Sequence, residues 1–240
     1  LLTTYGYSVE PGIKSVRLEN YYDGSTVEVP LDPDLSAIDN AKVYFAKYSK
    51  LKRTFEAVTE QLEQTKEELA HLESVRHYLD MAGTEDDLDQ LRIEMHEAGY
   101  IKSPGTGRNR QKNGTKAGRP WHYVTEDGFH LYAGRNNYQN DELTFKFASN
   151  SDWWFHVKGS AGSHVVLKTE GKEVPDKVFE LAGALAAWYS GKRNDEKVEV
   201  DYLERKNVKK PGGAKPGFVV YYTNYSLVAV PSLDGLTEIN

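Results

Sequence analysis

One long stretch of the chain repeats apolar residues at alternating spacings of three and four positions. The members of this repeat are Tyr44, Tyr48, Leu51, Phe55, Val58, Leu62, Thr65, Leu69, Leu72, Arg76 and Leu79. Such spacing is typical of a coiled-coil helix with one apolar stripe. Ser36 is a favourable N-cap, so we expect a helix from Ser36 to about Asp80, roughly 65 Å long. A stripe of this length has to be buried against another helix.

Shorter elements flank this helix. Downstream, Thr84 is expected to cap a second helix that ends at Gly99, with acidic residues in its first turn. Upstream, β-prone residues on both sides of Asp23-Gly24 predict a hairpin.

The second helix is too short to cover the apolar stripe of the first one. The partner helix therefore either precedes Leu1 or belongs to a second copy of the chain, and we expect this chain to self-associate. The sequence begins in mid-pattern without a methionine, which suggests a fragment of a longer protein.

From Trp121 onward the pattern changes to short alternating runs separated by turns. Strands are expected over residues 121–125, 129–133, 143–147, 153–157, 163–167, 198–202, 218–222 and 227–230, and a helix over 176–190. The predicted fold is α+β, with a long helical coiled-coil arm followed by a mostly antiparallel sheet domain that has one main helix. The expected division is a β-hairpin segment of the arm (1–35), coiled-coil helices (36–100), a basic Gly-rich linker (101–120) and the sheet domain (121–240).

The charge of the chain is distributed unevenly. Residues 1–100 carry 10 Lys+Arg against 20 Asp+Glu, whereas residues 101–240 carry 20 against 16. Two stretches, 101–119 and 205–215, hold six and five basic residues without any acidic one. Clustered basic residues favour a polyanionic partner such as RNA, although solvated surface is the simpler alternative.

Composition also excludes several classes of protein. The longest apolar run, residues 181–189, has nine residues, far fewer than a membrane helix needs. The chain has no cysteine, so disulfides and Cys-ligated zinc sites are excluded. We therefore expect a cytoplasmic protein with no membrane partner.

Catalytic and metal sites are poorly supported. Ser163 and His164 suggest a nucleophile and its base, but neighbouring side chains of a strand point to opposite faces, and the chain has no G-x-S-x-G motif. His156 and His164, with Asp152 nearby, offer ligands for a metal, but no H-E-x-x-H motif or acidic loop accompanies them. We expect no enzymatic activity, no cofactor and no metal.

Phosphate or RNA binding has more candidates. Arg135, Asn136 and Asn137 follow a strand end, and the loop 159–163 offers backbone N–H groups and two hydroxyls. The Pro/Gly-rich segment KNVKKPGGAKPG adds the lysines Lys206, Lys209, Lys210 and Lys215. These are the residue types that contact RNA backbones.

Three long segments of the C-terminal half resemble the NFACT-R domain of the NFACT family: DGFHLYAGRNNYQNDELTFKFAS, DWWFHVKGSAGSHVVL and KVEVDYLERKNVKKPGGAKPGFVVYYTN. The upstream segment NYYDGSTVEVPLDPDLSAIDNAKVYFAKYSKLKR is similar to the second half of the family's middle coiled coil. The family includes RqcH-type ribosome quality control proteins, also labelled fibronectin-binding protein A-like. One departure is Ala161, where the family usually has proline before Gly-Ser-His.

The resemblance implies a part of a ribosome quality control factor that rescues stalled nascent chains by tRNA-dependent C-terminal alanine tailing. It implies two partners, tRNA and the large ribosomal subunit with its rRNA and ribosomal protein. The ascending helix of the family's arm would precede Leu1. The RNA-binding residues that follow the family's motifs are Arg135, Asn136, Asn137, His156, Lys158, Ser163 and His164, and Lys206, Lys209, Lys210 and Lys215 follow both motif and charge.

Two alternatives remain. The chain could be a protein-interaction scaffold that dimerises through its coiled coil, or an adhesin that binds fibronectin. A salt-dependent affinity for RNA would distinguish an RNA-binding protein from a scaffold with an apolar interface.

Overall fold

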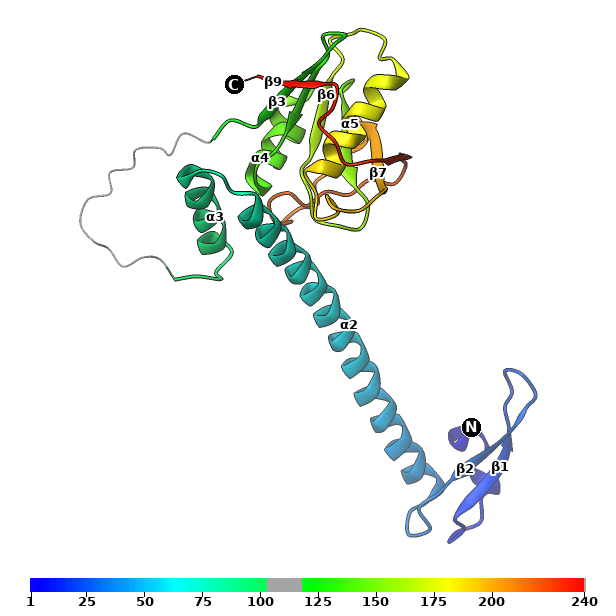
Figure 1. The fold of residues 1–240 in the computed structure, drawn as a ribbon. Helices are drawn as coiled ribbons and strands as arrows, with labels where there is room; N and C mark the ends of the chain where they lie inside the picture. Colours follow the sequence, from blue (N-terminus) through cyan, green and yellow to red (C-terminus); the bar gives the residue numbers. More distant parts are fainter. Residues whose placement is uncertain (103–117, 240) are drawn as a thin grey trace. The chain divides into compact units, whose positions relative to one another are not determined.

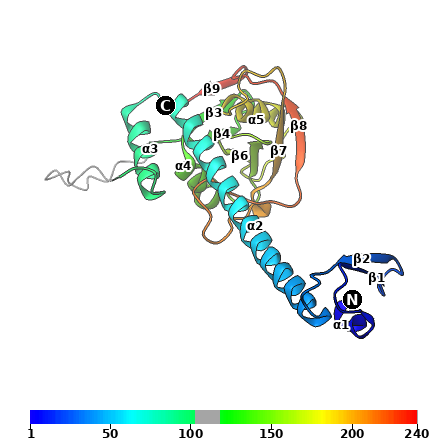
Figure 2. The ribbon, with the colours of Figure 1, turned by 90° about the horizontal axis from the view of Figure 1, so that it is seen from below.

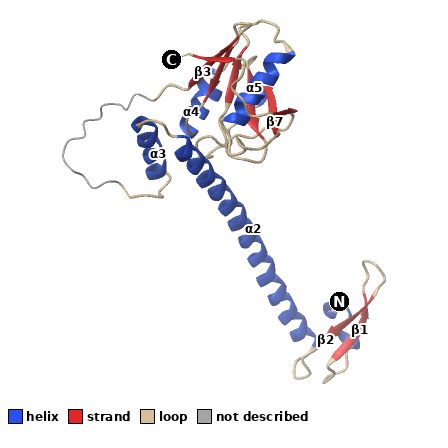
Figure 3. Ribbon diagram, in the orientation of Figure 1, coloured by secondary structure: helices blue, strands red, loops and turns tan. Residues whose placement is uncertain are grey.

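The computed structural model describes residues 1–102 and 118–239. The chain forms two compact units, residues 1–67 and 68–240, and the boundary between them falls within helix α2 (Figures 1 and 3). Most of the predicted basic linker, 101–120, lies outside the described residues. No helix in the described part of the chain is both long and apolar enough to cross a membrane.

The N-terminal unit joins a β-hairpin to the beginning of a long helix. Its elements are α1 (Leu2–Tyr5), the 3-10 turn η1 (Gly6–Ser8), β1 (Ser15–Glu19), β2 (Thr26–Pro30) and the first part of α2 (Ala37–Met81). The strands pair antiparallel, and Gly24 adopts a φ of 70° in the turn between them. The hairpin predicted around Asp23-Gly24 is therefore confirmed, whereas α1 was not predicted.

Helix α2 begins as predicted. The Ser36 hydroxyl oxygen accepts a hydrogen bond from the Asp39 amide at 3.1 Å and satisfies a free donor of the first turn. Within the N-terminal unit, the apolar stripe of α2 is exposed to solvent. Tyr48, Leu51, Phe55, Val58 and Leu62 each keep more than half of their surface accessible.

The C-terminal unit begins with a helical hairpin made of the end of α2 and α3 (Glu85–Glu97). Thr84 caps α3 in a reciprocal capping box with Asp87, as the acidic first turn predicted. Val75 and Tyr78 of α2 pack against Leu91 of α3 in a small core of buried side chains. Figure 2 shows α3 beside the end of α2.

A seven-stranded sheet forms the body of this unit. Its strands are β3 (Trp121–Thr125), β4 (His130–Ala133), β5 (Trp153–Val157), β6 (Val165–Lys168), β7 (Val198–Glu204), β8 (Tyr225–Ala229) and β9 (Leu236–Glu238). They lie in the order β8-β7-β5-β6-β4-β3-β9, and each pairing of neighbours is antiparallel. The α+β prediction with a mostly antiparallel sheet is confirmed.

Each face of the sheet is covered by different elements. Helix α5 (Asp176–Trp188) packs on one face and buries Val178, Ala182 and Leu185 against it (Figure 1). The other core centres on Trp154, together with residues from the segment after α4 (Asn137–Glu142) and from the chain that follows β7. The two sides of the sheet therefore have separate cores.

Two strand predictions were wrong. Residues Leu143–Phe147 form a π-helical segment, η2, that continues α4, although their apolar and polar residues alternate as in a strand. Residues 218–222 do not form a strand, and a single bridge joins Val220 to Lys209. The predicted helix 176–190 ends at Trp188, and β9 was not predicted.

Candidate nucleic-acid interface

The Gly-Arg-Asn-Asn motif after β4 starts helix α4. A Cβ atom on Gly134 would lie 2.2 Å from Asn140 Oδ1, so this close approach requires glycine. Asn136 is the N-cap, and its Oδ1 accepts a hydrogen bond from the Gln139 amide at 2.9 Å. With only 2% of its surface exposed, Asn136 has a side chain committed to the fold.

Asn137 connects α4 to the helical hairpin. Its Nδ2 donates to Glu94 Oε1 on α3 and to Ser74 Oγ on α2, both at 2.7 Å. His71 Nε2 is also hydrogen-bonded to Glu94 Oε1, at 2.9 Å. Asn137, Glu94 and His71 are all buried, and Glu94 Oε2 has no hydrogen-bond partner among the described residues. This cluster holds the sheet domain against the helices.

Arg135 makes a second connection to the helical hairpin. Its guanidinium donates from Nη2 to Asp87 Oδ2 at 3.0 Å and lies 4.9 Å from the centre of the Trp121 ring. Burial opposes ionisation of Asp87, but hydrogen bonds from Thr84 and the charge of Arg135 keep the pKa of this carboxyl below its usual value. Arg135 is therefore engaged within the chain.

Ser163 and His164 do not form a nucleophile–base pair. Ser163 Oγ donates to the Gly134 carbonyl oxygen at 2.6 Å, whereas His164 Nδ1 is hydrogen-bonded to Thr144 Oγ1 at 2.8 Å. Both side chains are buried, with 1% and 2% of their surface exposed. The two groups have separate partners, so the geometry offers no support for nucleophilic catalysis here.

His156 does converge on His164, since their ring centres are 5.5 Å apart. Burial lowers the pKa of His156 to about 4. Burial, together with the electrostatic effect of the neighbouring His156, holds the pKa of His164 well below its usual value. Both rings are therefore neutral at pH 7. Within 1–102 and 118–239 no group of three or more His, Cys, Asp or Glu side chains is arranged to hold a metal ion.

Residues 205–222 form an extended loop that we call the lysine loop. Backbone hydrogen bonds of 2.8 and 2.9 Å join Lys209 to Val220 and close its two arms into a short ribbon. The tip of the loop is held to the rest of the unit, because Lys210 forms an ion pair with Asp141 and Lys215 Nζ donates to Tyr100 Oη at 2.6 Å.

The remaining lysines of the loop are exposed to solvent. Lys206 forms an ion pair with the neighbouring Glu204, and the ammonium of Lys209 lies 5.9 Å from the centre of the Tyr222 ring. Tyr222 itself is 82% exposed. Lys158 is also exposed, at the end of β5, and pairs with Glu199 at 2.7 Å. The accessible cations among the predicted RNA-binding residues are therefore Lys158, Lys206, Lys209 and Lys210.

The structure thus separates the predicted residues into two groups. Asn136, Asn137, Ser163 and His164 are buried, and Arg135 and His156 are half-buried. The lysines lie at or near the surface. RNA contact stays a prediction for every residue of both groups.

A groove near the start of β3 was not predicted from the sequence. It has a volume of about 800 Å³ and is lined by aromatic, basic and acidic side chains that include His122, Tyr132, Lys146 and Phe147. Its aromatic residues come from β3, β4 and η2, so their proximity depends on the pairing of β3 with β4 and on the π-helical segment. The predicted strand at 143–147 hid this arrangement.

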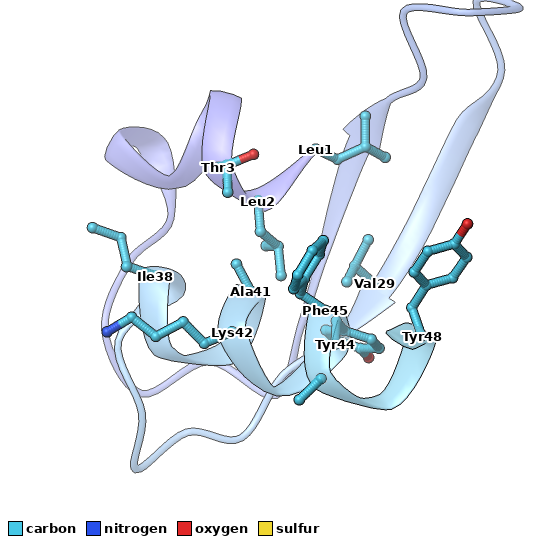
Figure 4. Close-up of a pocket in the computed structure, with 11 residues that line it drawn as sticks. Leu1, Leu2, Thr3, Val29, Ile38, Ala41, Lys42, Tyr44, Phe45 and Tyr48 are labelled. Atoms are coloured by element: carbon cyan, nitrogen blue, oxygen red, sulfur yellow. The ribbon is translucent and has the colours of Figure 1, made fainter. Parts of the chain in front are cut away.

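A second, apolar groove lies in the N-terminal unit. It has a volume of about 590 Å³ and is bordered by α1, β2 and the beginning of α2 (Figure 4). Leu2, Val29, Ala41 and Phe45 contribute to its lining, and Lys42 is the one charged side chain among the described residues that line it. It carries none of the predicted RNA-binding residues.

Comparison with protein families gives two matches along the chain. Residues 1–114 match the family model described as NFACT N-terminal and middle domains, and residues 119–222 match the NFACT protein RNA binding domain. The lysine loop and most of the residues that line the groove near the start of β3 lie within residues 119–222.

Among curated proteins, the chain is similar to proteins named Rqc2 homolog RqcH. It is 42% identical over 240 residues to the protein of Streptococcus suis and 33% identical over 246 residues to that of Bacillus subtilis. All of the chain is aligned in both cases, but only 42% of each relative is covered. The chain therefore spans less than half the length of these relatives.

A solved structure shares both sequence and fold with this chain. It is the C-terminal part of the fibronectin/fibrinogen-binding protein from Streptococcus suis, with 40% identity and a TM-score of 0.74. The match covers 84% of this chain and 78% of that one.

Proposed function

Because this chain belongs to the NFACT family, we propose that it is the part of a ribosome-associated quality control factor that binds RNA and the large ribosomal subunit. One observation carries the proposal. The range that matches the RNA-binding domain, residues 119–222, contains the lysine loop with its exposed cations and aromatic side chains. The names of the relatives, Rqc2 homolog RqcH, support the same role.

The lysine loop has the chemistry that RNA binding requires. Exposed ammonium groups replace the counterions of phosphates, and neighbouring aromatic rings offer faces for bases. Lys206 and Lys209 are the best candidates because their side chains are exposed, with Lys206 paired to Glu204 at the end of β7 and Lys209 beside Tyr222 of the loop itself. Lys210 and Lys215 contribute charge as well as fixing the tip of the loop.

The buried motif residues then act indirectly. Asn136, Asn137, Ser163 and His164 hold α4, β6 and the helical hairpin in place, and the exposed surface contacts the RNA. Direct contact of Asn137 with RNA would require the helical hairpin to separate from α4, because its side chain is hydrogen-bonded to Ser74 and Glu94.

The wider role follows the resemblance to RqcH-type proteins. We propose that the chain serves tRNA-dependent C-terminal alanine tailing of stalled nascent chains in the cytoplasm. It would do so by binding, and peptide transfer would belong to the ribosome. The chain itself would be no enzyme and would need no cofactor.

The test is binding of the chain to tRNA and to purified large ribosomal subunits at 50 and 200 mM salt, roughly the range over which phosphate contacts weaken strongly. The variant Lys206→Ala/Lys209→Ala is compared with Lys177→Ala/Lys197→Ala, which removes the same charge from exposed positions outside the lysine loop. We expect salt-sensitive binding that only the first variant loses. Equal binding by both variants would contradict the role of the loop.

A second candidate comes from the name of the solved neighbour, the fibronectin/fibrinogen-binding protein of Streptococcus suis. An immobilised fibronectin surface in the same assay tests it. Tight, salt-insensitive binding to fibronectin with no affinity for tRNA or ribosomal subunits would favour the adhesin.

A further inference from the structure

The groove at the start of β3 contains a row of three aromatic rings. His122 and Tyr132 face each other across the pairing of β3 with β4, and their rings stack at 4.3 Å with an interplanar angle of 10°. Phe147, from η2, meets Tyr132 edge-on at 4.6 Å. We call these three residues the aromatic platform.

The platform is accessible at its outer end. Phe147 keeps 42% of its surface exposed. Trp121 also lines the groove but is already occupied, since it stacks on Tyr189 at 4.0 Å and Arg135 lies over its ring. The other rings of the groove are those of the platform. Phe147 is the most exposed of them, and Lys168 Nζ lies 4.9 Å from the centre of its ring.

Charged groups surround the platform. Arg119 and Lys146 are exposed cations that line the groove. Glu142 and Glu238 line it too, and a carboxylate accepts hydrogen bonds from the exocyclic amino groups of bases. Aromatic faces, cations and hydrogen-bond acceptors together match the chemistry of a nucleotide: base, phosphate and base edge.

We propose that this groove binds unpaired nucleotides of an RNA strand, with a base stacked on the aromatic platform and phosphates beside Arg119 and Lys146. The inference rests on the proposed RNA-binding function and adds to it a second contact, separate from the lysine loop. A duplex keeps its bases stacked inside, so it cannot use the platform and binds through its backbone alone.

An RNA strand fits better than a free nucleotide. A groove of about 800 Å³ lies near the upper end of the volumes of ligand pockets and is partly open to solvent rather than fully enclosed. A strand also adds phosphate contacts beyond the stacked base, which a mononucleotide lacks.

The test uses a ten-nucleotide single-stranded RNA that carries 2-aminopurine, a base whose fluorescence is quenched by stacking. A duplex of the same sequence and adenosine monophosphate serve as the other ligands. Phe147→Ala is compared with Tyr22→Ala, which removes an exposed ring from the N-terminal hairpin, and with Lys206→Ala/Lys209→Ala. Thermal melting verifies that each variant is folded.

We expect Phe147→Ala to weaken binding of the single strand about 5- to 100-fold and to abolish the quenching, with duplex binding unchanged. Tyr22→Ala should behave as the unaltered chain. Single-strand binding and quenching that survive Phe147→Ala would overturn the inference while leaving RNA binding by the lysine loop intact. Binding of adenosine monophosphate as tight as that of the strand would also overturn the inference. If the unaltered chain binds no RNA at all, both the groove and the proposed RNA-binding function are overturned.

Discussion

The hydroxyl of Tyr78, near the end of α2, donates a hydrogen bond to the carbonyl oxygen of Gly162 at 2.9 Å. It also accepts one from Asn140 Nδ2 at 2.6 Å, and the tyrosine is 1% exposed. Gly162 lies so close to its neighbours that a Cβ would come within 2.9 Å of Val157. The end of the long helix is thus an integral part of the sheet domain.

Replacing Tyr78 with phenylalanine should therefore destabilise the C-terminal unit. The change leaves the Gly162 carbonyl and the Asn140 amide without this partner in a buried site, at a cost of about 1–3 kcal/mol. Urea unfolding followed by far-UV circular dichroism measures it. Tyr48→Phe, at a 61% exposed position on the same helix, is the control and should change stability by less than about 0.5 kcal/mol.

Asn137 distinguishes a structural role from direct RNA contact. Asn137→Ala removes two donated hydrogen bonds and leaves the carboxylate of Glu94 with fewer partners, so we expect a loss of about 2–4 kcal/mol in the free energy of unfolding. The RNA affinity of the folded protein should change little. A stable Asn137→Ala variant with greatly reduced RNA affinity would instead show that this side chain reaches the ligand.

His156 makes stability depend on pH below neutrality. Its pKa is about 4 in the folded protein, because burial disfavours the charged ring, against about 6.5 in the unfolded chain. The unfolded state therefore binds more protons between these values. The stabilisation is complete above pH 6.5 and is lost as the pH falls toward 4.

Between pH 7.5 and 5.0 this single residue should lower the free energy of unfolding by roughly 1–2 kcal/mol. Urea titrations at both pH values, on the unaltered chain and on His156→Gln, measure the contribution. His164 has its pKa lowered in the same direction, in part by His156, so the difference between the two proteins measures His156 together with its effect on His164. An identical pH dependence in the two proteins would refute the assignment.

The exposed stripe of α2 predicts that this chain self-associates. Phe55, Val58 and Leu62 expose 73%, 55% and 51% of their surface, and an apolar stripe of this kind gains stability when a second helix covers it. Sedimentation equilibrium at high micromolar concentration should detect a dimer. Phe55→Glu/Leu62→Glu should abolish the dimer, whereas Val43→Glu, outside the stripe, should not, and a monomeric unaltered chain would contradict the prediction.

The helical arm was predictable because its signals are local. The caps at Ser36 and Thr84 and the repeated spacing of the stripe depend on neighbours within a few residues, and the structure reproduces them. The hairpin at Asp23-Gly24 was predictable for the same reason.

The prediction of a strand at 143–147 was wrong because alternation of apolar and polar residues over five positions also fits a helical turn. Leu143 and Thr144 are adjacent and both buried, which a strand with one covered face would not allow. They are buried because one packs beside Trp154 and the other is hydrogen-bonded to His164. These are tertiary contacts, and no local pattern encodes them.

The candidate site was predictable only in part. The lysine loop could be predicted because its lysines are clustered along the sequence itself. The aromatic platform was missed because it combines His122, Tyr132 and Phe147 from three elements. The polar motif at Asn136-Asn137 resembled a ligand site, but its partners Ser74 and Glu94 lie more than 40 residues away along the chain.

The central claim is that the lysine loop binds RNA through its phosphates, and the salt dependence of tRNA affinity tests it most directly. Each phosphate contact contributes a slope of about −0.7 to −0.9 to the plot of log affinity against log salt concentration. We expect Lys206→Ala/Lys209→Ala to make this slope shallower by about 1.4 to 1.8, while Lys177→Ala/Lys197→Ala leaves it unchanged. The same slope in all three proteins would contradict the account.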